Sequence, residues 1–240
     1  MARSRPPPEG DWLGELQEGA RRLGVRLPPE APALFACYMR ELLRWQARAS
    51  LTGFRTPGAI VRGGFLDSLA CLRALPESPL RLVDIGSGAG FPGLPLALAR
   101  PDLQVTLVEA SRRRHSFLAH ACRKLGLRNV RCLHGRAESL APALRGRFDV
   151  ALARAVRRRE EAAALAAPFL RPGGLFVGQP EAMAGQGPPP PLSGFGPPAV
   201  CPVPTGVGPA RAVLAYPRLA DAAPGAGAAR PPARDVSRET

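Results

Sequence analysis

Short apolar runs alternate with stretches of helical periodicity between residues 80 and 178, and no other feature of the sequence restricts the fold as strongly. The runs that resemble buried strands are 80–85, 104–108, 130–133, 148–153 and 175–178. The helical stretches are 94–100, 112–125, 140–144 and 158–170. Strands and helices that alternate at this spacing are typical of a parallel sheet covered by helices on both faces. The sequence therefore predicts an α/β fold with right-handed crossovers.

The segments that flank this alternation differ from it in pattern. Apolar residues recur at helical spacing in 12–23, 33–49 and 59–75, so the region before the first strand is predicted to be helical. Near the other end, 200–203 and 212–216 are expected to add an antiparallel pair at the sheet edge. The predicted organisation is a disordered N-terminus (1–10), a helical extension (11–78), an α/β domain (79–218) and a disordered tail (219–240).

Composition excludes several classes of protein. With 240 residues, of which 45% are hydrophobic, the chain can bury a core of ordinary size. No apolar run approaches the roughly 18 residues that a membrane span needs, and the N-terminus lacks the apolar core of a secretory signal. No C-x-x-C pair is present, which argues against a zinc ribbon or a disulfide framework. We therefore expect a cytoplasmic protein without a membrane segment, with free thiols at Cys37, Cys71, Cys122, Cys132 and Cys201.

The chain is strongly basic, with 33 Lys and Arg against 19 Asp and Glu and a formal net charge of +14. Such a surplus suits a polyanionic partner such as nucleic acid. A GC-rich coding sequence would also enrich arginine, together with Ala, Gly and Pro, so charge alone leaves both explanations open. Two arginine runs, 112–114 and 157–159, follow predicted strand ends, where they either face solvent on a helix or contact phosphates.

A glycine-rich loop, Asp84 to Gly93, follows the first predicted strand and precedes a helix. Glycine allows a tight turn and a close approach of the backbone to a ligand. The spacing Gly88-x-Gly90-x-x-Gly93 also matches the dinucleotide-binding fingerprint, so two cofactors compete for this loop. The carboxylate of Asp84 would repel a pyrophosphate, whereas it attracts the ammonium and sulfonium charges of S-adenosylmethionine. The residues therefore favour S-adenosylmethionine and leave a dinucleotide as the alternative.

Further candidates for a cofactor site lie at the ends of the later strands. Glu109 ends the second strand, where its carboxylate can accept hydrogen bonds from the ribose hydroxyls of either cofactor. After the third strand, the Ala137 N–H and the Glu138 carboxylate can address an adenine edge, although a helix dipole also favours an acid there. Arg154 ends the fourth strand, on the carboxyl edge where open α/β sheets bind ligands. The three histidines lack metal-ligand spacing, so no metal site is predicted.

Several motifs within roughly residues 12–216 match the pattern of one enzyme family. They are 43–46 (LRWQ), 50–52 (SLT), 65–69 (FLDSL), 84–93 (DIGSGAGFPG), 136–138 (RAE) and 148–155 (FDVALARA). On these motifs the chain resembles the bacterial 16S rRNA guanine-N7 methyltransferases, also called glucose-inhibited division protein B. The form of the glycine loop, preceded by a helical Asp-Ser-Leu, is fairly specific to that family, whereas the bare glycine pattern is not.

The resemblance implies a class I methyltransferase fold, a Rossmann-like sheet of seven mostly parallel strands with a helical N-terminal extension. It implies 16S rRNA, free or within the small ribosomal subunit, as the partner of an enzyme that we expect to be a monomer. It also implies S-adenosylmethionine as the cofactor. The expected cofactor-binding residues are Gly86, Gly88, Phe91, Glu109, Ala137, Glu138 and Arg154.

The implied chemistry needs few catalytic groups. Guanine N7 has an in-plane lone pair and no proton to lose, so attack on a sulfonium methyl requires no general base. Alignment of the reacting atoms carries most of the task, and no catalytic residue is assigned. The chain departs from the family pattern where Ser50 replaces Asn, Gly64 replaces His, Ala153 replaces Ser and Gln179-Pro180 replaces Lys-Gly. A weakened RNA-binding paralogue and a dinucleotide-dependent oxidoreductase therefore stay as alternatives.

Overall fold

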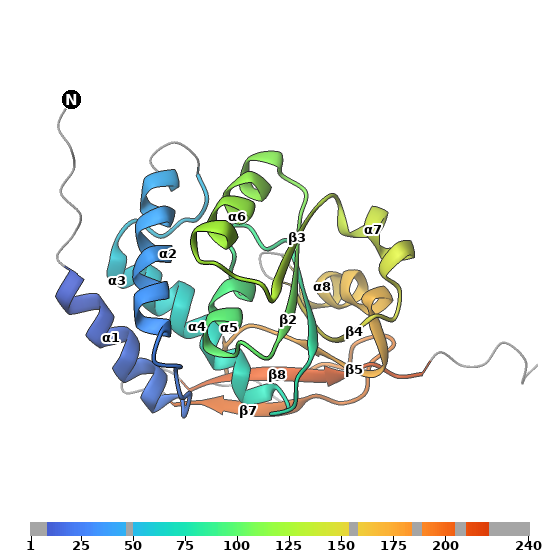
Figure 1. The fold of residues 1–240 in the computed structure, drawn as a ribbon. Helices are drawn as coiled ribbons and strands as arrows, with labels where there is room; N and C mark the ends of the chain where they lie inside the picture. Colours follow the sequence, from blue (N-terminus) through green and yellow to red (C-terminus); the bar gives the residue numbers. More distant parts are fainter. Residues whose placement is uncertain (1–8, 47–49, 154–157, 184–188, 205–209, 221–240) are drawn as a thin grey trace, which may run out of the picture.

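The structure, a computed structural model, describes residues 9–46, 50–153, 158–183, 189–204 and 210–220. Its centre is an eight-stranded sheet in the order β3-β2-β1-β4-β5-β8-β6, with β7 paired to β8. Helices cover both faces, and the N-terminal helices form a further layer on one side (Figure 1). The strands are β1 (Arg81–Ile85), β2 (Gln104–Glu109), β3 (Val130–His134), β4 (Phe148–Ala153), β5 (Leu170–Val177), β6 (Glu181–Ala182), β7 (Ala199–Val203) and β8 (Arg211–Pro217). The α-helices are α1 (Glu9–Arg22), α2 (Ala31–Gln46), α3 (Pro57–Ile60), α4 (Asp67–Ala70), α5 (Gly93–Ala99), α6 (Arg112–Lys124), α7 (Ala137–Leu144) and α8 (Arg159–Ala166).

The α/β fold predicted from the strand–helix alternation is confirmed. Strands β1 to β5 pair in parallel, with β1 at the centre between β2 and β4. The predicted antiparallel pair at the edge is also confirmed, because β8 pairs antiparallel with both β5 and β7. The sheet has eight strands where seven were expected, because the two-residue strand β6 also pairs with the start of β8. A strand of two residues is too short to leave a pattern in the sequence.

Two predicted helices are shorter or more broken in the structure. The helix predicted over 158–170 ends at Ala166, because Pro168 cannot donate within a helix and fits a following 3₁₀ turn instead. The segment 59–75 forms a π-helical turn (Val61–Leu66) between α3 and α4, then a 3₁₀ turn (Cys71–Ala74). The π-helical turn contains Gly63, where an added Cβ would lie 2.6 Å from the Phe54 ring. Close packing against an aromatic ring thus fixes a shape that helical periodicity does not reveal.

Successive residues of each central strand face two different cores. On β1, Leu82 joins the core under α5, α6 and the N-terminal helices, whereas Val83 joins the core under α7 and α8. Helix α5 is buried along its whole length, because it lies between the sheet and the helices α2 and α4. Since α5 directly follows the glycine loop, the packing of the core determines where that loop sits.

The helical extension is attached to the sheet's own helices by a hydrogen bond to a buried carboxylate. Glu41 on α2, 7% exposed, accepts a 2.7 Å hydrogen bond from Nε2 of His120 on α6 and a 3.0 Å bond from Arg44. Burial acts to raise the pKa of Glu41, but the hydrogen bond from His120 and the charges of Arg44 and Lys124 outweigh it. The net pKa of Glu41 therefore lies below its ordinary value, so the ionised form stabilises the fold.

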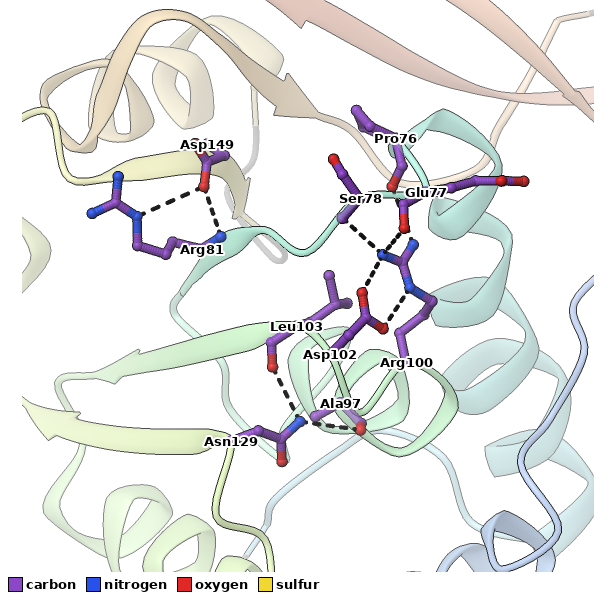
Figure 2. Close-up of polar contacts among 10 residues, drawn as sticks. All are labelled: Pro76, Glu77, Ser78, Arg81, Ala97, Arg100, Asp102, Leu103, Asn129 and Asp149. Carbon is purple, nitrogen blue, oxygen red and sulfur yellow. Dashed lines mark hydrogen bonds and ion pairs between the residues drawn. The ribbon is translucent and has the colours of Figure 1, made fainter.

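The side of the sheet where the parallel strands begin, here called the amino edge, contains arginines that form hydrogen bonds within the chain (Figure 2). Arg100, which follows α5, donates to the carbonyl oxygens of residues 76–78 and binds both oxygens of Asp102, at 2.9 and 2.6 Å. The hydrogen bond from Arg100 holds the pKa of Asp102 below its ordinary value. At the start of β1, the backbone N–H of Arg81 donates to Asp149 at 2.7 Å. These contacts bind the guanidinium group of Arg100 and the backbone of Arg81 within the chain.

An ion pair joins the extension to the antiparallel side of the sheet. Arg211, at the start of β8, binds both carboxylate oxygens of Asp67 on α4, at 2.9 and 3.0 Å. The same guanidinium donates to the carbonyl oxygen of Pro180 at 3.0 Å. This three-way contact fixes the segment that follows β5 at its carboxyl end.

Several sequence predictions concern the ends and the thiols of the chain. The segments predicted to be disordered, 1–10 and 219–240, lie largely outside the described residues, and the domain boundaries at 78 and 218 stay predictions. The five cysteines are free thiols, as predicted. Among the helices that the structure describes, none is both long and apolar enough to cross a membrane.

The variant Glu41→Gln is expected to lose about 1–2 kcal/mol of unfolding free energy at pH 7, because a charge-assisted hydrogen bond is removed. A folded-state pKa below the ordinary 4.5 means that ionised Glu41 stabilises the protein above that pH and ceases to do so as the pH falls through the folded value. The difference from wild type should therefore shrink in acid, as measured by urea unfolding at several pH values. Glu30→Gln, at an exposed position just before α2, is the control. A deficit that is independent of pH would contradict this account.

Candidate functional site

The glycine loop leaves β1 at the carboxyl edge of the sheet and is bound to the neighbouring strand. The backbone N–H groups of Gly86 and Ser87 both donate to the carbonyl oxygen of Val108 on β2, at 2.8 and 3.1 Å. Gly86 and Gly88 adopt φ angles of 72° and 58°. Such angles turn the backbone sharply at the edge where open α/β sheets bind their ligands.

Asp84 lies at the base of this loop with no exposed surface. One of its carboxylate oxygens accepts a 2.9 Å hydrogen bond from the backbone N–H of Gly93, the first residue of α5. The side chain therefore connects the two ends of the loop. Because Asp84 is buried, its negative charge would act on a ligand across the loop and not by direct contact. The side chain thus also has a structural role, besides the attraction for a cationic cofactor that was inferred from the sequence.

Two glycines of the loop are required by close packing. An added Cβ at Gly93 would overlap a methyl group of Leu107 and would lie 2.8 Å from the carboxylate of Asp84. At Gly90, where φ is 98°, the added Cβ would lie 2.7 Å from the hydroxyl of Tyr38. No larger residue fits either position without movement of the loop.

Tyr38 and Phe91 connect the helical extension to the back of the loop. The buried Tyr38 hydroxyl donates a 2.5 Å hydrogen bond to the carbonyl oxygen of Ala89. The Phe91 ring is 4% exposed, and its centroid lies 5.9 Å from the rings of both Tyr38 and Phe65. These three residues form the aromatic cluster. Because the Phe91 side chain packs there, a contact from Phe91 to a cofactor would have to use the backbone.

Sequence reasoning missed Tyr38. Its position in α2 has the ordinary periodicity of a core residue, and no local motif surrounds it. Only the tertiary structure shows that its hydroxyl reaches the loop. The one hint in the sequence was a tyrosine at a predicted core position, because a buried tyrosine hydroxyl usually has a hydrogen-bond partner.

Glu109 joins three elements at the carboxyl edge. Its carboxylate accepts one hydrogen bond from the Gly88 N–H, at 2.8 Å, and one from the Ser111 N–H before α6, at 2.7 Å. Its carbonyl oxygen accepts a 3.1 Å bond from Gly135, after β3. Each carboxylate oxygen keeps a second lone pair, so Glu109 can still accept from the two hydroxyls of a ribose.

The remaining predicted site residues are less closely tied to the loop. Ala137 and Glu138 begin α7, directly after β3, with Ala137 buried and Glu138 exposed. Among the described residues, no hydrogen bond joins the Glu138 side chain to the loop. Arg154 lies outside the described residues. The structure thus brings together Gly86, Gly88 and Glu109 directly, and Ala137 and Glu138 lie at the start of α7, after β3.

The departures from the family pattern occupy different surroundings. Ser50 is exposed, and Ala153 ends β4. Gly64 is buried, and an added Cβ there would lie 2.8 Å from the Phe91 ring. The side-chain nitrogen of Gln179 is buried without a hydrogen-bond partner in the described part of the chain. An amide donor thus lies directly after β5, at the carboxyl edge of the sheet.

The arrangement suits the binding of a nucleoside more than the activation of water or a metal. Two buried acids, Asp84 and Glu109, hold the glycine loop, and the Glu109 carboxylate can also accept hydrogen bonds from a ribose. In the part of the chain that the structure describes, no three His, Cys, Asp or Glu side chains gather so that they could hold a metal ion.

Comparison with known proteins agrees with a site that binds a nucleoside. Residues 32–181 match a family model described as GidB, rRNA small subunit methyltransferase G. Proteins named ribosomal RNA small subunit methyltransferase G are similar to the chain. The one from Roseiflexus castenholzii is 41% identical over 69% of this chain and 71% of its own length. The one from Deinococcus deserti is 44% identical over 68% of each chain, and the one from Streptococcus pyogenes serotype M1 is 37% identical over 70% of each.

Solved structures support the fold. MtNAS, solved in complex with MTA and tNA, covers 87% of this chain and 87% of its own, with a TM-score of 0.52 and 16% identity. At this level of identity the likeness concerns the fold alone.

Replacing Gly93 with alanine is expected to lower the unfolding free energy by about 1–3 kcal/mol, because the new methyl group overpacks the contact with Leu107. Affinity for S-adenosylmethionine should fall as well, since the loop must move. Urea unfolding and calorimetric titration measure the two effects. Gly14→Ala is the matched control, because Gly14 lies in α1 with nothing within 4 Å of an added Cβ. That variant should be neutral or more stable by up to about 1 kcal/mol, and equal losses in both variants would contradict the packing argument.

Proposed function

The chain belongs to the rRNA small subunit methyltransferase G (GidB) family, and from that premise we propose that it transfers a methyl group from S-adenosylmethionine to N7 of a guanine in 16S rRNA. The observation that carries this proposal is the contact of the Glu109 carboxylate with the glycine loop. It gives the carboxyl edge of the sheet a ribose acceptor beside a glycine loop that is held by a second buried acid, Asp84.

Asp84 favours a cationic nucleoside over a dinucleotide, whereas Glu109 can accept hydrogen bonds from the ribose of either. Asp84 and Glu109 are both buried and both accept hydrogen bonds from the loop. A pyrophosphate above this loop would bring two negative charges towards the buried carboxylate of Asp84, whereas a sulfonium and an ammonium are attracted there. Gly86, Gly88, Ala137, Glu138 and the backbone of Phe91 are proposed to complete the site, with Arg154 at the end of β4.

Methyl transfer to N7 requires the protein to align the reacting atoms but not to remove a proton. The bound donor supplies an electrophilic methyl group on a positively charged sulfur. The protein needs to hold the guanine so that its N7 lone pair lies in line with the carbon–sulfur bond that breaks. No side chain needs to remove a proton, because N7 carries none. The positive charge passes from the sulfur to the guanine ring, so an environment that is suited to cations serves both ends of the reaction.

Gln179 is proposed to orient the guanine. Its buried nitrogen lacks a protein acceptor among the described residues, and O6 of guanine, which lies beside N7, is a hydrogen-bond acceptor. Strand β5 is two strands away from β1, a separation of about 10 Å, which suits a base that lies next to the cofactor. The contact of Arg211 with Asp67 and Pro180 stiffens the segment that carries Gln179. We expect the enzyme to act in the cytoplasm as a monomer, on free 16S rRNA or on the small subunit.

The proposed reaction is tested with S-adenosylmethionine that carries a labelled methyl group. Small subunits and 16S rRNA from a strain without this activity should accept the label, and nucleoside analysis should find it as 7-methylguanosine. Because no side chain exchanges a proton in the chemical step, kcat should be nearly constant between pH 6 and 8. Donor binding without transfer would instead support the RNA-binding paralogue, and binding of NAD in place of the donor would support the oxidoreductase.

The role of Gln179 is tested by two substitutions of opposite character. Gln179→Glu keeps the shape but presents an acceptor to O6, so kcat/KM for the RNA should fall about tenfold or more, with little change in donor affinity. Gln179→Lys keeps a donor at the position and should retain most of the activity. If both variants behave alike, the amide does not read the guanine.

A further inference from the structure

The region that surrounds the candidate site contains a segment of one charge sign. From Ala110 to Ala137 the chain has no aspartate or glutamate. This segment holds α6 and β3, which is the outermost strand at one end of the sheet (Figure 1). It supplies +8 of the net charge of +14, from Arg112, Arg113, Arg114, Arg123, Lys124, Arg128, Arg131 and Arg136, which are exposed.

Half of these cations have ordinary structural reasons. Arg123 and Lys124 lie in the last turn of α6, where the helix dipole favours positive charge. Arg131 lies on an edge strand, where charge prevents pairing with another chain. Arg128, in the connection between α6 and β3, is a solvated loop residue.

The other four cations lack such a reason. Arg112–Arg114 form the first turn of α6, where the helix dipole disfavours cations. Arg136 precedes the first residue of α7, again at a helix start. Within the described ranges, no ion pair joins any of them to a carboxylate, in contrast to Arg100 and Arg171 at the amino edge. Arg112–Arg114 and Arg136 are called the arginine rim below.

The arginine rim borders the candidate site. Ser111, which directly precedes Arg112, donates to the Glu109 carboxylate that also holds Gly88. Gly135, which directly precedes Arg136, donates to the Glu109 carbonyl oxygen. Both parts of the rim therefore start one residue from a group that contacts Glu109.

We propose that the arginine rim binds the phosphate backbone of the RNA strand that carries the target guanine, an inference that rests on the proposed function. Unpaired guanidinium groups at a sheet edge suit phosphates, which they bind with paired hydrogen bonds. A membrane surface fits less well, because membrane-binding faces combine cations with exposed apolar side chains. In the described residues, the large apolar side chains that are exposed are Val200 and Leu219, on and just after the strands β7 and β8.

The test compares two triple variants of equal charge. The rim variant carries Arg113→Gln, Arg114→Gln and Arg136→Gln. The control carries Arg26→Gln, Arg145→Gln and Arg147→Gln, which are exposed and lie away from the carboxyl edge. Arg26 lines the same hollow as Arg100, and the other two lie between α7 and the start of β4. Both variants should fold, and the rim variant should be no less stable than wild type because its α6 loses unfavourable charges.

In methyl transfer to 16S rRNA, the rim variant should raise KM about tenfold, with kcat and donor affinity within about twofold of wild type. The control should leave all three nearly unchanged. The slope of log K against log salt for RNA binding should fall by about 2 in the rim variant, since each lost single-strand phosphate contact removes about 0.7. Equal effects in the two triple variants would overturn the proposal.

The binding measurement separates this inference from the proposed function. If wild type transfers no methyl group, the proposed function fails, yet the salt slope for binding of the same rRNA still shows whether the rim contacts phosphates. Vesicles rich in phosphatidylglycerol form a second arm. Loss of vesicle binding in the rim variant, with unchanged RNA binding, would assign the rim to a membrane surface and overturn the proposal.

Discussion

The hydrogen bond from Tyr38 to the carbonyl oxygen of Ala89 joins the helical extension to the glycine loop of the candidate site. Around it, the Phe91 ring packs on Tyr38 and Phe65, so the loop that follows β1 has an aromatic wall behind it. On the side of the sheet, Asp84 at the end of β1 and Glu109 at the end of β2 accept hydrogen bonds from the loop's own backbone. A loop held on both sides loses little conformational entropy when a ligand binds, which favours affinity. The extension is therefore required for the shape of the site, and not only for the size of the protein.

The two edges of the sheet use the same residue type in opposite ways. At the amino edge, Arg100 binds Asp102 (Figure 2) and Arg171 binds Asp149. At the carboxyl edge, the arginine rim lies at helix starts without such partners among the described residues. Charge that is paired internally contributes little to the field outside, whereas charge without a partner attracts polyanions. The net charge of the chain is thus less informative than its distribution relative to the strand ends.

The parts of the fold that the sequence predicted well are those set by short-range pattern. Strands β1, β2 and β4 are largely buried on both faces, and a run of mostly apolar residues signals this directly. Topology then places Glu109 at the carboxyl edge beside the glycine loop, because parallel strands end at the same side. Tyr38 was not predictable, since its partner lies 51 residues away and no local pattern encodes that distance. The broken helix over 59–75 packs against the rings of Phe54 and Phe91, which helical periodicity does not encode. Arg154 lies outside the described residues.

The departures from the family pattern look less damaging once their surroundings are considered. Gly64 stands where the pattern has a histidine, and the Phe91 ring lies close enough that an added Cβ would be 2.8 Å from it. The space next to the Gly64 backbone is therefore occupied by an aromatic ring, and packing is preserved. Gln179 replaces a lysine but still provides an N–H donor. Because transfer to N7 needs alignment and no proton acceptor, substitutions that preserve packing and a donor can preserve the reaction.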